Sequence, residues 1–342
     1  QGWNIGSILG VVFGGFLAEI NWRYIFLINV PIGLFALPIA FTKIKDISPR
    51  LHERLDIIGS IILGFSLLVV SMASFIIIGS GINVLSLMLL VISALSFIIF
   101  IVWESKCESP IIDLSLFKNR LLAFSMLAAS FYFTASYVVL FLLTIYLQGV
   151  RSLDPFTSSL LLLPGYAMAG IISPYMGRLS DKHGAQILAT LGLIFIAMGY
   201  TFYAILLSIN MQLYLISLIT ILTGLGTGTF FPANNSAVMA NSPRDKYGMV
   251  SGVYRTLNNI GMVLSFAIAL SIASLSIPKE TVFAVFVGEQ IGLPPNIGKA
   301  FIPGLRASFY TSTIIITLAA IMSVTRGKEK RQNLINNQQI VN

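Results

Sequence analysis

Charged side chains are scarce in this sequence of 342 residues. Asp, Glu, Lys and Arg together make up 10% of it, whereas a soluble globular domain carries about 25%. Hydrophobic residues make up 56%. No single soluble core could bury so much apolar sequence, but a helical bundle that faces lipid can expose it. The composition therefore excludes a soluble domain and predicts an integral membrane protein.

Cysteine and histidine are almost absent. Cys107 is the single cysteine, which excludes a disulfide framework and any metal site built from several cysteines. The two histidines, His52 and His183, are too few and too far apart in the sequence to propose a metal site. The sequence also lacks a Walker A glycine loop and a Ser-His-Asp grouping. It therefore predicts neither an enzyme nor a bound cofactor.

Carboxylates are missing from the middle of the apolar runs, because every Asp and Glu falls in a loop or at a helix end. The middle of the apolar runs therefore offers no carboxyl group that could bind and release a proton within the membrane. The formal net charge is +8, but the basic residues lie in short loops between apolar runs. That distribution is typical of the cytoplasmic loops of membrane proteins and argues against nucleic-acid binding.

What the sequence does contain is a series of long apolar runs. A bilayer core about 30 Å thick needs about 20 apolar residues in a helix, and backbone in lipid must satisfy its hydrogen bonds within the helix. We therefore predict an all-α integral membrane protein with about ten transmembrane helices. The predicted spans are 2–20, 24–42, 56–78, 83–103, 121–148, 156–177, 186–207, 212–238, 247–276 and 304–325.

The charges of the loops predict an orientation. With the loop at 43–55 placed in the cytoplasm, 15 of the 21 Lys and Arg residues fall on the inner side and five on the outer side. The outer loop at 277–303 contains several Gly and Pro residues and is predicted to be irregular. The polar tail at 327–342 is predicted to be disordered and cytoplasmic.

The first apolar run carries regularly spaced glycines. Gly6, Gly10 and Gly14 recur every four residues and so share a helix face, and Gly15 follows them. Small residues on one face let another helix approach closely, and ordinary helix packing would be sufficient to explain them. Trp22 then begins a stretch that runs to Gly33, and its aromatic residues are also typical of membrane-interface anchors.

Together the two segments resemble the fourteen-helix drug:proton antiporters of the major facilitator superfamily. That family has a glycine-rich fifth helix, the antiporter motif, followed by a Trp-Arg-x-x-Phe-x-Ile-Asn-x-Pro-x-Gly stretch. The residues from Trp22 to Gly33 match the stretch, but Val11 stands where the antiporter motif usually has proline. Proline would remove a backbone donor and bend the helix, so the packing of the first helix departs from the pattern at this point.

A second resemblance lies in the segment from Gly177 to Gly184, predicted as a cytoplasmic loop. It is similar to the loop motif of the superfamily, which runs Gly-x-Leu-x-Asp-Arg/Lys-x-Gly; the matching residues named here are Gly177, Arg178, Asp181, Lys182 and Gly184. The basic pair that usually ends the motif is replaced by Ala185 and Gln186. The resemblance implies that the Asp181 carboxylate faces the positive end of the helix that begins near Tyr247. A solvated turn is the alternative.

Polar residues inside two predicted spans suggest where a substrate is bound. Arg255 lies in a span, where an ionisable residue is costly and suggests function or pairing between domains, unless it snorkels to the interface. The segment 224–235 combines glycines, Pro232 and two asparagines, which fits either an irregular cavity helix or polar contacts between helices. The candidate cavity residues are Phe131, Tyr132, Tyr137, Phe230, Asn234, Asn235 and Asn258.

The resemblance implies a major facilitator-type bundle that lacks about four helices ahead of Gln1. Residues 1–43 would be the last two helices of the N-terminal half, 44–105 a two-helix central insert, 106–326 the C-terminal six-helix half and 327–342 the tail. It also implies a plasma-membrane transporter that exports small lipophilic or cationic compounds by proton antiport, with the missing helices needed for transport. The alternatives are another substrate class, such as amino acids, siderophores or lipids, or an inactive, truncated membrane protein.

Overall fold

The computed structural model describes residues 2–21, 23–43, 56–81, 83–107, 110–243, 246–273 and 295–327. Within these ranges the regular elements are all helices, and eight helices are long and apolar enough to cross a membrane. The predicted all-α membrane fold is thereby confirmed. The elements are α1 Gly2–Ile20, α2 Arg23–Leu27, α3 Asn29–Lys43, α4 Ile57–Ser80, α5 Val84–Glu104, the 3₁₀ helix η1 Leu114–Lys118, α6 Arg120–Ile145, the π-helical turn η2 Tyr146–Val150, α7 Pro155–His183, α8 Ala185–Leu206, α9 Leu213–Ala240, α10 Tyr247–Ala273 and α12 Pro295–Thr325.

Polar side chains set the points at which several of these helices begin. Asp56, Asn83, Asn119 and Asp154 precede α4, α5, α6 and α7, and each accepts a hydrogen bond from a backbone N–H of the first turn. That contact satisfies a donor that would otherwise have no partner in the helix. Because these caps flank the apolar runs, the starts of these four helices lie within one residue of the predicted starts.

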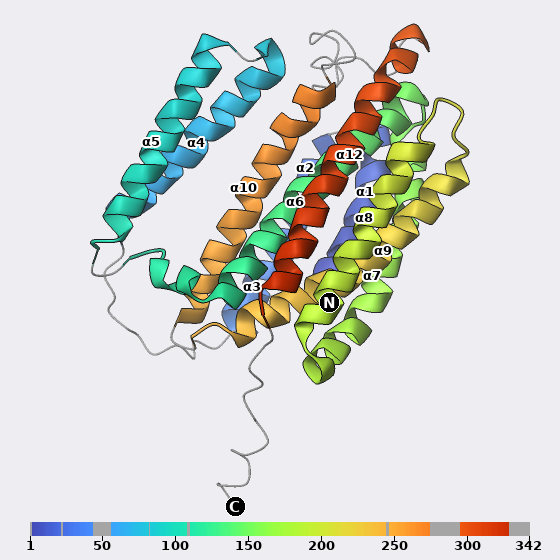
Figure 1. Ribbon diagram of the computed structural model, residues 1–342. Helices are drawn as coiled ribbons and strands as arrows, with labels where there is room; N and C mark the ends of the chain where they lie inside the picture. Colours follow the sequence, from blue (N-terminus) through green and yellow to red (C-terminus); the bar gives the residue numbers. More distant parts are fainter. Residues whose placement is uncertain are drawn as a thin grey trace, which may run out of the picture.

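The C-terminal part of the chain forms the main bundle (Figure 1). Helix α9 packs along α7 on one side and α8 on the other, α12 packs against α8 and α6, and α10 packs against α6. The buried hydrophobic core runs through α6, α8, α9 and α12. The candidate functional residues from Phe131 onward are positioned by this bundle.

Glycines on two sides of α9 allow its neighbours to come very close. A Cβ on Gly224 would lie 2.8 Å from the Gly165 carbonyl carbon in α7, and a Cβ on Gly226 would lie 2.6 Å from the Gly192 carbonyl oxygen in α8. These distances are too short for any side chain, because the atoms met are backbone. The glycine-rich segment of α9 therefore serves helix packing on both sides.

Helices α4 and α5 form a hairpin that packs on α10 through α4 (Figure 1). Two buried serines join the hairpin: the Ser66 hydroxyl donates to the Ser93 carbonyl at 3.1 Å, and the Ser93 hydroxyl donates to the Ser66 carbonyl at 3.0 Å. Small polar side chains that bond across helices are a common way to hold helices together in lipid. The remaining faces of the hairpin expose large apolar side chains, as expected for contact with lipid.

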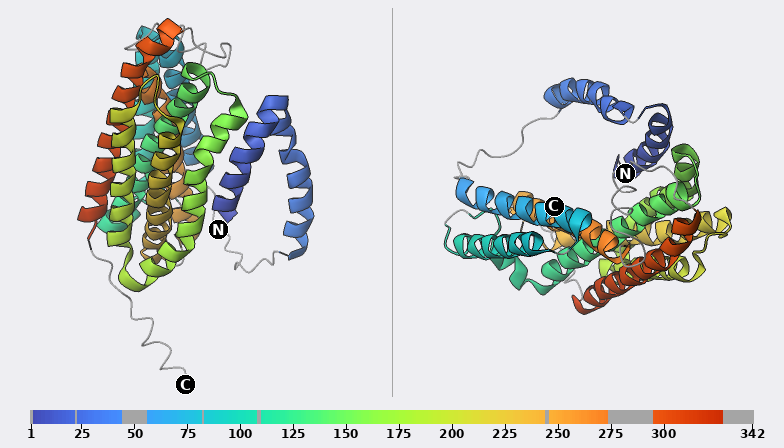
Figure 2. Two further views of the ribbon diagram at one scale, coloured as in Figure 1. Left: turned by 90° about the vertical axis from the view of Figure 1, so that its right-hand side faces the viewer. Right: turned by 90° about the horizontal axis from the view of Figure 1, so that it is seen from above.

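Helix α1 packs against α7 at the edge of the bundle, and α2 and α3 follow on the far side of α1 (Figure 2). Gly15 is buried where α1 meets α7, and a Cβ there would lie 2.9 Å from Cβ of Ser159. The rings of Phe16 and Phe156 meet edge to face at 6.3 Å. Among the described residues nothing lies within 4 Å of a Cβ built on Gly6, Gly10 or Gly14, so the predicted packing of that glycine face stays a prediction.

Two predicted boundaries were wrong. Helix α7 continues to His183, so the segment predicted as a loop from Gly177 is helical for another two turns. Helix α12 begins at Pro295, within the region predicted to be irregular, and Pro303 lies inside it. The predicted span 24–42 is confirmed as one apolar stretch, Arg23–Lys43, although its helix is interrupted at Ile28, where the Asn29 side chain donates to the Ile25 carbonyl. Most of the predicted tail, 328–342, lies outside the described residues.

Candidate functional site: an aromatic cavity and its polar surroundings

A cavity of about 270 Å³ lies between α6, α7, α8 and α9. Tyrosines and hydroxyl side chains dominate its wall, and no residue of the lining carries a charge. The polar lining residues are Tyr132, Ser136, Tyr137, Tyr166, Tyr200, Tyr203, Thr220, Thr223 and Thr227. A mostly apolar, concave wall with a few fixed polar groups is typical of a small-molecule site.

Hydrogen bonds hold part of this wall in place. The Tyr132 hydroxyl donates to Thr227 at 3.2 Å, and the Tyr200 hydroxyl donates to Ser136 at 2.9 Å. The Tyr203 hydroxyl donates to the Ile216 carbonyl at 3.1 Å. These bonds connect α6 to α9, α8 to α6 and α8 to α9, and they fix the positions of the aromatic rings in the cavity wall.

The structure brings only two of the predicted cavity residues to this wall, Tyr132 and Tyr137. Phe230 is fully buried behind Tyr132, with ring centroids 5.0 Å apart. Phe131 is half-buried and packs against the hydrophobic core, and Asn235 is half-buried away from the cavity lining. Phe230 therefore supports the wall without forming its surface.

Asn234 lies outside the cavity, in a buried polar cluster between helices. Its side-chain nitrogen donates to the Ser125 carbonyl at 3.0 Å, and its side-chain oxygen accepts from Arg326 at 3.0 Å. Arg326 also donates to the Ser125 hydroxyl at 3.1 Å. These contacts join α6, α9 and the end of α12. Asn258, on α10, is also buried and does not line the cavity.

The side chain of Arg326 is buried. This arginine follows the last apolar run, and the loop-charge pattern predicts only that it lies on the inner side. In the structure its side chain is only 2% exposed. From the end of α12 the guanidinium reaches acceptors on α6 and α9.

Arg255 is exposed on α10, so it lies on the outside of the described bundle rather than in the cavity. The predicted helix around it is present, since α10 runs from Tyr247 to Ala273. Its predicted role in function or pairing between domains stays a prediction.

The predicted loop motif lies at the end of α7 and in the turn that follows it. The carboxylate of Asp181 accepts a hydrogen bond from the Ser236 hydroxyl on α9 at 3.1 Å, and its predicted position facing the start of α10 stays a prediction. Gly177 lies beside Pro232 of α9, and Gly184 has φ of +91°, a conformation that favours glycine. Arg178 and Lys182 are exposed on the last turns of α7.

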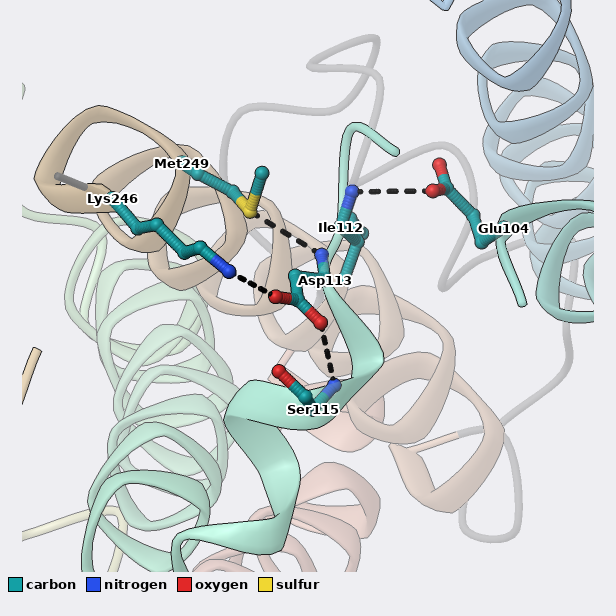
Figure 3. Close-up of polar contacts among 6 residues, drawn as sticks. All are labelled: Glu104, Ile112, Asp113, Ser115, Lys246 and Met249. Atoms are coloured by element: carbon teal, nitrogen blue, oxygen red, sulfur yellow. Dashed lines mark hydrogen bonds and ion pairs between the residues drawn. The ribbon is translucent and has the colours of Figure 1, made fainter. Parts of the chain in front are cut away.

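The linker between α5 and α6 is attached to the first turn of α10 (Figure 3). Lys246 forms an ion pair with Asp113 at 2.5 Å, and the Asp113 N–H points to the Met249 sulfur at 3.3 Å. The Asp113 carboxylate also caps η1 through the Ser115 N–H. The Lys246 ammonium, helped by Ser115, lowers the pKa of Asp113 to about 2.

The low pKa gives a pH prediction. The ionised Asp113 carboxylate adds to the stability of the native state. This contribution is fully present above the unfolded pKa of about 3.9 and is lost as the pH falls through the folded pKa of about 2. Asp113→Asn keeps a side chain that can cap η1 but removes the charge. We expect it to weaken the attachment of the linker to α10 by about 0.2–1 kcal/mol of free energy. Thiol labelling of the half-buried Cys107 should then be up to about fivefold faster at neutral pH.

A charge swap provides the control for that prediction. The double variant Asp113→Lys with Lys246→Asp restores opposite charges at the same place and should return the labelling rate toward the wild-type value. Equal rates in the wild type and Asp113→Asn would contradict a role of the ion pair in holding the linker.

Sequence reasoning missed Tyr166, Tyr200 and the threonines of the cavity. One signal was available: Thr220, Thr223 and Thr227 are spaced by three and four residues and so share a face of α9. Within the described part of the chain no group of three or more His, Cys, Asp or Glu residues could hold a metal ion.

Comparison with known proteins gives consistent matches. A family model described as Major Facilitator Superfamily matches residues 2–266. The chain is 32% identical over 267 residues to the Riboflavin transporter RibZ of Clostridioides difficile, covering 77% of the chain and 57% of the relative. It is 28% identical over 273 residues to the Multidrug resistance protein Stp of Mycobacterium tuberculosis, covering 79% and 50%.

A further relative is the Lincomycin resistance protein LmrB of Listeria monocytogenes, 26% identical over 300 residues, which covers 86% of the chain and 63% of that protein. The chain thus spans less than two thirds of the length of these curated relatives.

Proposed function

Since the chain belongs to the Major Facilitator Superfamily, we propose that it is part of a plasma-membrane secondary transporter that exports small lipophilic or cationic compounds. Proton antiport drives the export, and alternating access exposes the aromatic cavity to each side in turn. The observation that carries the proposal is the tyrosine-lined wall between α6, α7, α8 and α9. The multidrug and lincomycin resistance relatives support the export of drug-like compounds.

The chemistry of the wall fits such cargo. Tyrosine rings offer large apolar area and also attract a cation that lies over the ring face. Hydroxyl groups of tyrosine and threonine accept and donate hydrogen bonds, so they suit ligands of varied shape. In the proposed whole transporter, the other half of the superfamily architecture faces this wall and supplies the coupling carboxylate.

A second candidate function is the transport of an uncharged planar nutrient. The riboflavin-transporting relative favours it, and the absence of charge from the cavity lining fits a neutral aromatic ring as well as a lipophilic one. The two candidates share the site and differ in the ligand.

Transport in membrane vesicles tests both candidates. We expect vesicles that carry the whole transporter, of which this chain is proposed to be a part, to move ethidium or riboflavin when a pH gradient is imposed. The dye that is moved identifies the class of cargo. Tyr137→Ala removes one ring from the cavity and should lower the rate at limiting substrate about tenfold, since a lost contact of about 1.4 kcal/mol is a tenfold loss of affinity.

Tyr175→Ala is the matched control, because Tyr175 is exposed on the outer face of α7 and outside the cavity lining. Its rate should stay close to that of the wild type. Equal losses in Tyr137→Ala and Tyr175→Ala would remove the support for this cavity as the substrate site. Transport without a pH gradient would contradict proton antiport.

A further inference from the structure

Glu104 is a buried carboxyl group at the end of α5. Its side chain is 3% exposed. One carboxyl oxygen accepts a long hydrogen bond of 3.4 Å from the Ile112 N–H (Figure 3), and the other oxygen has no hydrogen-bond partner among the described residues. A buried carboxylate without a neighbouring cation is costly, and accepting a proton removes that cost. The surroundings of Glu104 therefore favour its neutral form.

A second carboxylate, Asp56, lies beside the first. A Cβ on Gly59 would be 3.1 Å from the Glu104 Oε1 and still closer to the Asp56 Oδ2, so both oxygens face the same point of the first turn of α4. Gly59 leaves the space that the two groups occupy. Two carboxyl groups in one such place do not readily both carry a charge.

The two carboxyl groups differ in their hydrogen-bond donors. Asp56 accepts from the Gly59 N–H at 2.8 Å, and the Trp103 indole N–H points to both of its oxygens at 3.1 and 2.9 Å. It also caps α4, where the helix dipole favours a negative charge. Asp56 thus has several donors, whereas Glu104 has one long hydrogen bond and an oxygen with no partner among the described residues, so Glu104 is the member that takes the proton.

The other charged groups nearby do not compensate Glu104. Asp56 is the titratable group of α4. On the linker, Asp113 is paired with Lys246 from the start of α10, while Lys106 is exposed and Cys107 half-buried after α5. In the described part of the chain, no salt bridge reaches Glu104.

We propose that Asp56 and Glu104 form a binding site for one proton at the base of the α4–α5 hairpin. An O–H bond forms on the Glu104 carboxyl, with the proton taken from water on the predicted cytoplasmic side, and that group donates toward the Asp56 carboxylate. Two carboxyl groups are too few for Ca²⁺, which takes six to eight oxygen ligands. The proton is the ligand that fits the pair.

The site is separate from the aromatic cavity and reaches the main bundle through the linker. Glu104 contacts the backbone of Ile112, and the next residue, Asp113, holds Lys246 at the foot of α10. Loss of the proton places a second negative charge beside Asp56 and alters the contact with Ile112. A change in the protonation of the pair therefore changes the contacts of the linker segment that holds α10.

The fluorescence of Trp103 tests the proposal, since its indole bonds directly to Asp56. Trp3→Phe and Trp22→Phe leave Trp103 as the reporter, and His52→Gln and Cys107→Ser remove the imidazole and the thiol nearest in sequence to Asp56 and Glu104. Ordinary carboxyl groups stay ionised between about pH 5 and about pH 9. We expect the emission to change over this range, and Glu104→Gln to abolish the change.

Glu19→Gln is the matched control, because Glu19 is exposed at the end of α1; it should keep the full pH response. Asp56→Asn provides a second readout that does not depend on the folding of the Glu104 variant: it removes the neighbouring charge and should shift the response to lower pH. An emission that is flat over the range, or a response that persists in Glu104→Gln, would overturn the proposal. So would a response that follows sodium concentration at constant ionic strength, which would indicate a bound cation.

Discussion

Gly224→Ala is expected to destabilise the protein by about 1–3 kcal/mol, the usual cost of adding a methyl group to a tightly packed interior. The added Cβ would meet the Gly165 backbone, at 2.8 Å from the carbonyl carbon and 2.9 Å from Cα. Backbone cannot rotate out of the way as a side chain can, so α7 and α9 must separate. Alanine favours the helix itself by up to about 1 kcal/mol, which is too little to offset the clash.

The same separation should change the cavity, because Gly165 and Gly224 both line it. We therefore expect Gly224→Ala to lower both the midpoint of thermal unfolding in detergent and the binding of substrate. Gly64→Ala in α4 is the control. Among the described residues, no atom outside the backbone of its own helix lies within 4 Å of the added Cβ. Helix propensity should therefore leave the stability unchanged or raise it by up to about 1 kcal/mol. Equal midpoints for the two variants would contradict the close crossing.

The course of the helices could be predicted because lipid imposes one rule on all of them. Long apolar runs must be helical, and their ends are marked by capping residues such as Asp56 and Asn119. The end of α7 escaped that rule. Its last two turns contain Arg178, Asp181 and Lys182, which a hydropathy scan assigns to a loop although a helix is free to extend beyond the lipid.

The cavity could be predicted only in part, because the bundle helices are apolar around most of their circumference. Periodicity identifies the inward face of a helix when its other face is polar, and α6 offers no such contrast. Tyr132 and Tyr137 were found because they are aromatic, and so was Phe131, which lines no part of the cavity. Tyr166 and Tyr200 come from other helices, and only the packing of α7 and α8 brings them to the same place.

The polar cluster at Arg326 was beyond the reach of sequence rules for a related reason. An arginine after an apolar run is normally exposed on the inner side, and nothing local distinguishes this one. Its acceptors on Ser125 and Asn234 lie 201 and 92 residues away in the chain. The burial of Arg326 is thus a property of the tertiary fold.

Arg326→Gln is accordingly expected to cost about 1.5–3 kcal/mol, the net value of hydrogen bonds made by a charged group. Glutamine is too short to reach both acceptors, so the Ser125 hydroxyl and the Asn234 side-chain oxygen lose a donor in a buried place. Denaturation of the purified protein measures the loss. Arg178→Gln is the matched control, since Arg178 is exposed, and its effect should stay within about 0.5 kcal/mol.

A double-mutant cycle makes this prediction specific to the contact. Ser125→Ala removes the hydroxyl that accepts from Arg326 and leaves the Ser125 carbonyl, which Asn234 uses, in place. If the two side chains interact as the structure indicates, the double variant should be less destabilised than the sum of the single variants by about 0.5 kcal/mol or more. Strict additivity would mean that Arg326 stabilises the fold through other contacts, and the proposed link between α12 and α6 would then be wrong.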